Sequence, residues 1–326
     1  LYLIANDYFH SGIPYNEETD IALPKYYDSA VGSEKEISYD RTYYFPNSSD
    51  SSLMHIVSFD TKDANKKADV QTYIGSSNSV YVSTSSIYTA LTDYNYGTSD
   101  SPQVTSTVNS TIYKFDIEKG SVTYKAKNRI EGSLLNQFSM DEYDKHFRVA
   151  TTKENWANPN STSENLLYIL DGDLKEVGKL TGLAKGEQIK SVRFMGERAY
   201  LVTFKTVDPL FVIDTKDPKN PKVLGELKIP GYSSYLHPYD KDHLIGLGYD
   251  TEVIDEENEI IVNKGIKMAV FNVSDVNNPK ELFSEIIGDK GSYSEVLYNH
   301  KALMFDKSRN LIAFPATIQK QSTQSI

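Results

Sequence analysis

A pattern of apolar and polar positions recurs along the chain. A mostly apolar run ends in Asp or Asn, a short polar turn follows, and a second, alternating run ends near Gly in four of the five copies. Alternation with a period of two is typical of a half-buried β-strand, and a polar turn between two such runs predicts an antiparallel hairpin. The five copies occupy residues 55–75, 112–132, 166–184, 211–231 and 268–288.

The Asp or Asn that ends each first run has a predicted structural role. Its side chain can accept a hydrogen bond from the backbone N–H two residues later, which closes a tight turn. Prolines in the later copies preset φ in these turns, and glycines end the second runs where the chain must bend. We call the five acceptors the Asx positions; they lie 43 to 58 residues apart, at Asp60, Asp116, Asp171, Asp214 and Asn272.

A second hairpin is predicted between successive copies. Residues 191–204 are the clearest example, with a tight turn at 196–198. No segment of ten or more residues has helical periodicity. Each repeat therefore contains two hairpins, and four antiparallel strands in a repeat of about 45–55 residues are typical of a β-propeller blade. The counterparts of this hairpin are residues 137–151, 234–248 and 295–305.

These repeats predict an all-β protein, a β-propeller of four-stranded antiparallel blades. The predicted strands are enough for six to seven blades, and the blades at the two ends of the chain are partial. Residues 1–6 are expected to form the second strand of a first blade, and Tyr293 to Thr317 the first two strands of a last one. We expect a single propeller domain over residues 1–318, followed by a polar tail over 319–326.

Composition and charge exclude several function classes. The net charge is −11 and the pI is near 5.1, so binding to nucleic acid through its phosphates is not expected. No run approaches the ~20 apolar residues of a membrane span, so this segment is not expected to insert into a membrane. The absence of Cys excludes disulfides, thiol catalysis and thiolate metal sites. The chain begins inside an apolar run without a signal peptide, and we expect that its targeting signal is missing from this sequence.

Three stretches resemble a family of secreted bacterial and archaeal proteins whose β-propeller domain is distantly related to WD-40 repeats. They are residues 133–152, 186–251 and 269–282, and the likeness is strong over roughly 130–320 and weaker before. The resemblance implies an extracytoplasmic protein, secreted or on the cell surface. The family carries no settled activity, so the resemblance implies no catalytic residue.

Long insertions break the repeat and are rich in aromatic residues. They span residues 7–52, 93–110 and 152–165 and are expected to open on one face of the propeller. One interpretation is a recognition surface for protein or polysaccharide, and the other is that the loops only pack over the face and plug the channel. The candidate binding residues are Tyr26, Tyr43, Tyr94 and Trp156.

One acidic insertion supplies the candidate residues for metal binding. Asp255, Glu256 and Glu257 belong to an acidic insertion that is expected to form a protruding hairpin, where calcium is the cation that carboxylates could hold. The other interpretation of this run is a solvated charged loop. The six histidines lack metal-ligand spacing, and His146 and His300 are expected in or beside solvated turns. No other cofactor is expected.

The sequence therefore favours an extracytoplasmic binding or interaction module of the bacterial cell envelope, whose ligand is a protein or polysaccharide. The alternative is a propeller enzyme, either a hydrolase or a lyase, whose active site lies at the channel mouth and acts with or without a metal ion. The inner strands offer mostly apolar and hydroxyl residues, such as Val192, Phe194 and Leu236, which disfavours the enzyme. A purely structural spacer is a third hypothesis.

Overall fold

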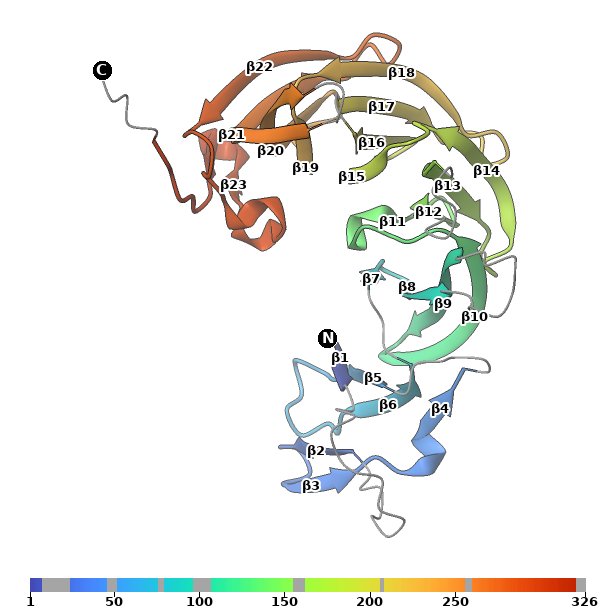
Figure 1. Ribbon diagram of the computed structural model, residues 1–326. Helices are drawn as coiled ribbons and strands as arrows, with labels where there is room; N and C mark the ends of the chain where they lie inside the picture. The colour runs from blue at the N-terminus through green and yellow to red at the C-terminus, as the bar shows by residue number, and fades with distance from the viewer. Residues whose placement is uncertain are drawn as a thin grey trace, which may run out of the picture. The chain divides into compact units, whose positions relative to one another are not determined.

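The computed structural model describes residues 1–7, 24–45, 52–75, 79–95, 107–154, 162–205, 208–255 and 260–320. These residues form β-strands and three-residue 3-10 turns and contain no α-helix. Five four-stranded sheets hold most of the strands (Figure 1). The chain divides into two compact units, Leu1–Asp93 with Ser110–Ile130 and Tyr94–Asn109 with Glu131–Ile326.

Sheet I, in the first unit, has the strand order β1-β5-β6-β4. β1 pairs antiparallel with β5, and β5 pairs antiparallel with β6 across the turn that holds Asp60. An Asx position follows the third strand of a repeat, and Asp60 follows β5, so β5 is a third strand. Its antiparallel partner β1 is therefore a second strand, which confirms the prediction for residues 1–6. β4 runs parallel to β6 and forms the other edge of the sheet. The bounds are β1 (Tyr2–Asp7), β5 (Leu53–Ser58), β6 (Asp69–Ile74) and β4 (Thr42–Tyr44).

The predicted loop over residues 7–52 is only partly a loop. Its described part contains a hairpin, a 3-10 turn and β4, so the expectation of one long loop on one face is wrong for this part. The reason is that residues 42–44 pair with β6, which no other strand covers on that side. The additional elements are β2 (Lys25–Asp28), β3 (Ser33–Glu36) and η1 (Tyr39–Arg41).

Sheet II has the order β10-β9-β8-β7 and belongs to the first unit, apart from a few strand-end residues. Its strands are β7 (Ser79–Val82), β8 (Ser86–Asn95), β9 (Thr107–Glu118) and β10 (Ser121–Glu131). Within the unit, aromatic and aliphatic side chains from sheets I and II share one core cluster, which includes Met54, Ile56, Ile87 and Phe115.

Sheets III, IV and V of the second unit each contain four strands in chain order, the arrangement predicted for each repeat. Sheet III comprises β11 (Met140–Tyr143), β12 (His146–Lys153), β13 (Glu164–Leu170) and β14 (Glu176–Leu183). Sheet IV comprises β15 (Gln188–Met195), β16 (Arg198–Phe204), β17 (Asp208–Asp214) and β18 (Lys222–Ile229). Sheet V comprises β19 (Tyr232–Pro238), β20 (His243–Asp255), β21 (Ile260–Asn272) and β22 (Lys280–Ile287).

Alternate residues of these strands form the core of the second unit. Ile169 of sheet III packs with Val192 and Leu201 of sheet IV in one buried cluster. Val212 of sheet IV packs with Phe271 of sheet V in the next. Sheet IV therefore buries one face against sheet III and the other against sheet V, which explains why the apolar run of its third strand is nearly continuous.

The hairpin predicted over residues 295–305 is displaced. Residues 295–302 form two 3-10 turns, because the side chains of Ser294 and Asn299 accept hydrogen bonds from the N–H groups of Val296 and Lys301. The antiparallel pair lies further on, between β23 and β24, so the prediction of two strands within Tyr293 to Thr317 is confirmed. The bounds are η3 (Glu295–Leu297), η4 (His300–Ala302), β23 (Met304–Asp306), η5 (Lys307–Arg309) and β24 (Leu311–Ala313).

Four of the five Asx positions have the predicted role. The side-chain oxygens of Asp60, Asp171, Asp214 and Asn272 each accept a hydrogen bond from the N–H two residues later, at 2.9–3.1 Å. The prediction is wrong for Asp116, because β9 continues through it to Glu118 and the turn follows at Lys119 and Gly120, both with positive φ.

Candidate functional site

An aromatic groove of about 600 Å³ lies in the first unit, beside β4 and β6 of sheet I and β10 of sheet II. Its lining is mostly aromatic, with a few polar side chains and one lysine. Aromatic and polar groups in one concave surface are typical of small-ligand sites. The aromatic residues of this groove are Tyr43, Tyr44, Phe45, Tyr73 and Tyr124, and the polar ones are Gln71, Thr123 and Lys127.

Arg41 holds β4 in place at the edge of sheet I. Its Nε and Nη2 donate to the carbonyl oxygen of Val70 at 3.2 and 3.1 Å, and Nη2 also pairs with the carboxylate of Asp69. Tyr43 then lies opposite Tyr73 in the parallel β4–β6 register. An insertion in the chain thus supplies one wall of the groove and a regular strand supplies another.

The rings of the groove form a continuous stack. Tyr43 and Tyr73 have centroids 5.2 Å apart with planes at 26°, and Tyr73 and Phe45 have centroids 5.4 Å apart with planes at 9°. Phe45 in turn stacks on Tyr113 at 3.8 Å. Such offset stacking contributes about 0.5–1.5 kcal/mol per pair beyond the area buried. The stack therefore fixes the ring planes before any ligand arrives.

Burial separates the floor of the groove from its rim. Phe45 and Tyr73 are only 7% and 3% exposed, whereas Tyr43, Tyr44 and Tyr124 are 42%, 70% and 41% exposed. The hydroxyl of Tyr73 donates to Gln71 Oε1 at 2.9 Å, while Gln71 Nε2 donates to the carbonyl oxygen of Val122 at 2.8 Å. The rim rings thus rest on a floor that is anchored by hydrogen bonds.

Three tyrosines in and beside the groove, Tyr73, Tyr113 and Tyr124, are held in the neutral form. Burial raises the pKa of Tyr113 to about 12 and also raises the pKa values of Tyr73 and Tyr124. Their hydroxyls can therefore donate hydrogen bonds at neutral pH. The groove offers exposed ring faces for an apolar ligand surface and hydroxyl, amide and ammonium groups for a polar edge.

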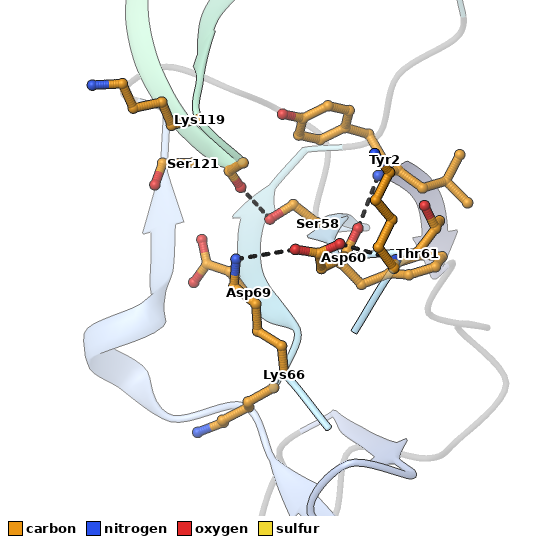
Figure 2. Close-up of a pocket in the computed structure, with 13 residues that line it drawn as sticks. Tyr2, Ser58, Asp60, Thr61, Lys66, Asp69, Lys119 and Ser121 are labelled. Carbon is orange, nitrogen blue, oxygen red and sulfur yellow. Dashed lines mark hydrogen bonds and ion pairs between the residues drawn. The ribbon is translucent and has the colours of Figure 1, made fainter. Parts of the chain in front are cut away.

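A more polar pocket of about 430 Å³ lies at the turns of sheets I and II in the first unit (Figure 2). Ser58 Oγ donates to the carbonyl oxygen of Gly120, which joins the two turns, and Lys66 pairs with Asp60 at 3.5 Å. The backbone N–H of Lys62 lowers the pKa of Asp60. The terminal amino group of Leu1 is part of the wall, and a preceding residue would replace it, so this pocket is a weaker candidate than the groove.

The structure separates the predicted aromatic residues. Tyr43 lines the aromatic groove, but Tyr26 is half-buried on β2 and lines other pockets of the first unit. Tyr94 is 52% exposed near the end of β8. Trp156 lies outside the described residues. Sequence reasoning did not single out Phe45, which follows β4 in the same insertion, or Tyr73 and Tyr124, which lie on the strands β6 and β10 beside it.

The predicted protruding hairpin is confirmed. β20 and β21 pair from His243 opposite Asn272 to Asp255 opposite Ile260. Asp255 ends β20, whereas Glu256 and Glu257 lie outside the described residues. Over the described ranges, no three His, Asp or Glu side chains come together in a group that could hold a metal ion.

Sequence reasoning overlooked Arg193 and the long-range contact of His300. The alternation along β15 buries Val192 and Phe194, as the apolar pattern indicates, but it places Arg193 on the opposite side of the strand. His300 lies in the 3-10 turn η4 and is half-buried, and its ring is 4.8 Å from that of Phe138 and edge-on to it. The alternation could have revealed Arg193; no local signal reveals the contact of His300, which spans more than 160 residues.

Four-stranded antiparallel sheets that repeat along the chain define the class of this protein as a β-propeller. The family model described as a beta propeller domain matches residues 1–326, so the chain belongs to that family.

Two curated relatives are archaeal proteins whose names describe them as uncharacterized. One, from Methanocaldococcus jannaschii, is 47% identical over 192 residues, which cover 58% of this chain and 28% of that protein. The other, from Archaeoglobus fulgidus, is 42% identical over 207 residues, covering 63% of this chain and 30% of that protein. The matched part thus spans less than a third of either relative. The described residues include no helix with the length and apolar character that a membrane span requires.

Proposed function

We propose that this chain is an extracytoplasmic binding module that recognises polysaccharide of a cell envelope through the aromatic groove. The observation that carries the proposal is the set of three exposed tyrosine rings, Tyr43, Tyr44 and Tyr124, beside a floor of buried aromatic residues. Exposed aromatic rings that are gathered beside one concave surface are typical of recognition sites.

Sugar chemistry fits this lining. A pyranose ring has an apolar face of C–H groups and a polar edge of hydroxyls, and the groove presents flat rings together with Gln71, Thr123 and Lys127. A folded protein partner would need about 800 Å² of contact on each side, which is more than a groove of this size presents. We therefore favour polysaccharide over protein as the ligand.

The cellular location rests on the resemblance to secreted propeller proteins that are distantly related to WD-40 repeats, and on the absence of Cys, which is compatible with it. Both relatives are archaeal, so the proposal concerns cell envelopes in general and not only those of bacteria. Fractionation of cells that produce the full-length protein tests this part, and recovery in the cytoplasmic fraction contradicts it.

Substitution of the rim tyrosines tests the ligand. We expect Tyr44→Ala and Tyr124→Ala each to weaken binding to purified envelope polysaccharide at least tenfold, about 1.4 kcal/mol. Affinity electrophoresis or calorimetry with the purified chain measures this change. Tyr39→Ala is the matched control, because Tyr39 is 75% exposed on η1 of the same unit and does not line the groove.

Two results contradict the proposal. One is that Tyr44→Ala and Tyr124→Ala bind as tightly as the unaltered chain. The other is that Tyr39→Ala weakens binding as much as they do. Since all three side chains are more than 40% exposed, their removal leaves the fold in place, which a thermal unfolding curve checks.

A further inference from the structure

A cluster of polar and aromatic side chains lies in the second unit, apart from the aromatic groove. Its centre is Arg193 on β15, with Tyr235 and His237 on β19, Phe138 on η2 (Gln137–Ser139) and His300 on η4. One guanidinium group thus has neighbours from four parts of the second unit. They are the first strands of sheets IV and V, the residues before β11 and the segment before β23. We call these five residues the guanidinium cluster.

The guanidinium of Arg193 is held between two rings. Its Cζ lies 4.1 Å from the ring centroid of Phe138 and 5.4 Å from that of Tyr235. Its Nε donates to the carbonyl oxygen of Leu236 at 2.8 Å. The Nη2 atom is buried and makes no hydrogen bond to any described residue. The side chain is therefore fixed in position, but its Nη2 atom can still donate a hydrogen bond to a ligand.

No carboxylate among the described residues pairs with Arg193. Asp141 is the acidic residue whose charge acts on it, but Asp141 Oδ2 accepts hydrogen bonds from Nε and Nη2 of Arg148. Burial lowers the pKa of Arg193. A cation that is desolvated without a counter-ion is destabilising, and an anion that reached it would relieve that cost.

The neighbours of Arg193 are neutral hydrogen-bonding groups. The hydroxyl of Tyr235 and Nδ1 of His237 are hydrogen-bonded at 3.0 Å, and the Nε2 atom of His300 lies 3.5 Å from Gln137 Nε2. Burial, together with the charge of Arg193, lowers the pKa of His237, and burial, together with the charges of Lys301 and Arg193, lowers the pKa of His300. Near pH 7 the cluster therefore carries one positive charge and several groups that can donate a hydrogen bond.

We propose that the guanidinium cluster binds the carboxylate group of a small acidic ligand, such as a sugar acid. One guanidinium matches one carboxylate in charge, whereas a phosphate dianion would bring two charges to a single cation. The aromatic rings beside Arg193 would contact the carbon skeleton of the ligand. This inference goes beyond the proposed function and uses none of the residues of the aromatic groove.

Calorimetric titration of the whole chain tests the proposal with four probes: D-glucuronate, acetate, D-glucose and inorganic phosphate. We expect saturable binding of glucuronate and weaker binding of acetate, and no binding of neutral glucose. Arg193→Met should weaken glucuronate binding roughly tenfold or more, because it removes the only described cation of the cluster. Lys301→Met is the matched control, since it removes one positive charge from the adjacent position on η4.

A second measurement does not depend on the folding of Arg193→Met. In the unaltered chain, the imidazole NMR signals of His237 and His300 should shift and saturate with glucuronate, while that of His146, the first residue of β12, stays unchanged. The proposal is overturned if no carboxylate produces a saturable shift, if phosphate binds and glucuronate does not, or if a folded Arg193→Met binds glucuronate as well as the unaltered chain.

Discussion

Arg148 on β12 has the largest of the fully buried side chains that the structure describes. Its Nε and Nη2 bind the carboxylate of Asp141 within sheet III. Its Nη1 donates to the carbonyl oxygen of Gly196 at 2.6 Å and to Thr215 Oγ1 at 2.8 Å, both in sheet IV. One buried guanidinium thus satisfies a carboxylate of one sheet and two acceptors of the next.

We expect Arg148→Met to destabilise the chain by about 3 kcal/mol, because it leaves the partly buried carboxylate of Asp141, the buried hydroxyl of Thr215 and the carbonyl of Gly196 without their donor. Urea unfolding followed by fluorescence measures the loss. Arg198→Met is the control, since the Arg198–Asp214 pair at 2.6 Å is more exposed to solvent and should cost about 1 kcal/mol or less. Equal losses in the two variants contradict the role assigned to Arg148.

The half-buried His237 predicts how stability depends on pH. The pKa of His237 is lowered by burial, so below about pH 6.5 the unfolded chain takes up a proton more readily than the folded one. Stability is therefore highest above that pH and falls as the pH drops toward the folded pKa. The carboxyls whose pKa values are lowered, such as Asp217 and Asp240, lose their contribution only below about pH 4.

His237→Gln should reduce the fall of the thermal midpoint between about pH 7.5 and 5.5, because it removes one group that must stay neutral in the folded state. Differential scanning calorimetry at several pH values measures the slope. His146→Gln serves as the comparison variant, because the ring of His146 is hydrogen-bonded to the carbonyl oxygen of Asp144 in its own turn. If both variants keep the slope of the unaltered chain, the assignment to His237 is wrong.

At the residue scale, the sequence predicted roles that depend on near neighbours along the chain. Asp214 closes its own turn, which is visible in the stretch that follows it. Arg193 and His300 acquire their contacts from strands and turns that are distant in sequence, and no spacing encodes those contacts. Tyr43 was identified because it belongs to an insertion, but Tyr73, its stacking partner, looks like any strand residue.

At the scale of elements, the turns at the Asx positions have a second role that links successive sheets of the second unit. A Cβ added to Gly178 of β14 would lie 2.2 Å from the carbonyl oxygen of Pro218, in the β17–β18 turn. A Cβ added to Gly225 of β18 would lie 2.5 Å from the carbonyl oxygen of Val276, in the β21–β22 turn. The fourth strand of one sheet thus contacts the turn of the next sheet through a glycine.

Gly178→Ala should destabilise the chain by about 1–3 kcal/mol, because a backbone carbonyl cannot move aside as a flexible side chain can. Chemical unfolding measures the change. Gly172→Ala is the control, as a Cβ there meets nothing within 4 Å and the position does not require positive φ. If the Gly178→Ala protein were as stable as Gly172→Ala, sheets III and IV could move apart at this point without a loss of stability, and the assigned contact would be wrong.

The strand pairs within repeats could be predicted because alternation and turn chemistry act locally. β4 could not, since its pairing with β6 is parallel and joins residues 30 positions apart. The last hairpin was placed about nine residues too early, because the apolar run near Val296 resembles a strand while the hydrogen bonds of Ser294 and Asn299 close 3-10 turns there.

At the scale of the whole molecule, the acidic composition bears on the kind of polysaccharide that the groove can accept. The net charge of −11 repels polyanions at low ionic strength, and only one lysine, Lys127, lines the groove. Contacts between tyrosine rings and the apolar faces of sugars carry no charge, so salt does not screen them. The proposed ligand is therefore a neutral polysaccharide.

The affinity for a neutral envelope polysaccharide should change less than about twofold between about 0.05 and 0.5 M NaCl, a range over which the Debye length falls from about 14 to about 4 Å. An acidic polymer with a similar backbone should bind more weakly at low salt and improve as salt is added. If the neutral polymer instead lost about tenfold in affinity across this range, charged groups would carry the binding. The lysines around the pocket of Figure 2 would then be the site, and Lys66→Ala would weaken binding where Tyr44→Ala does not.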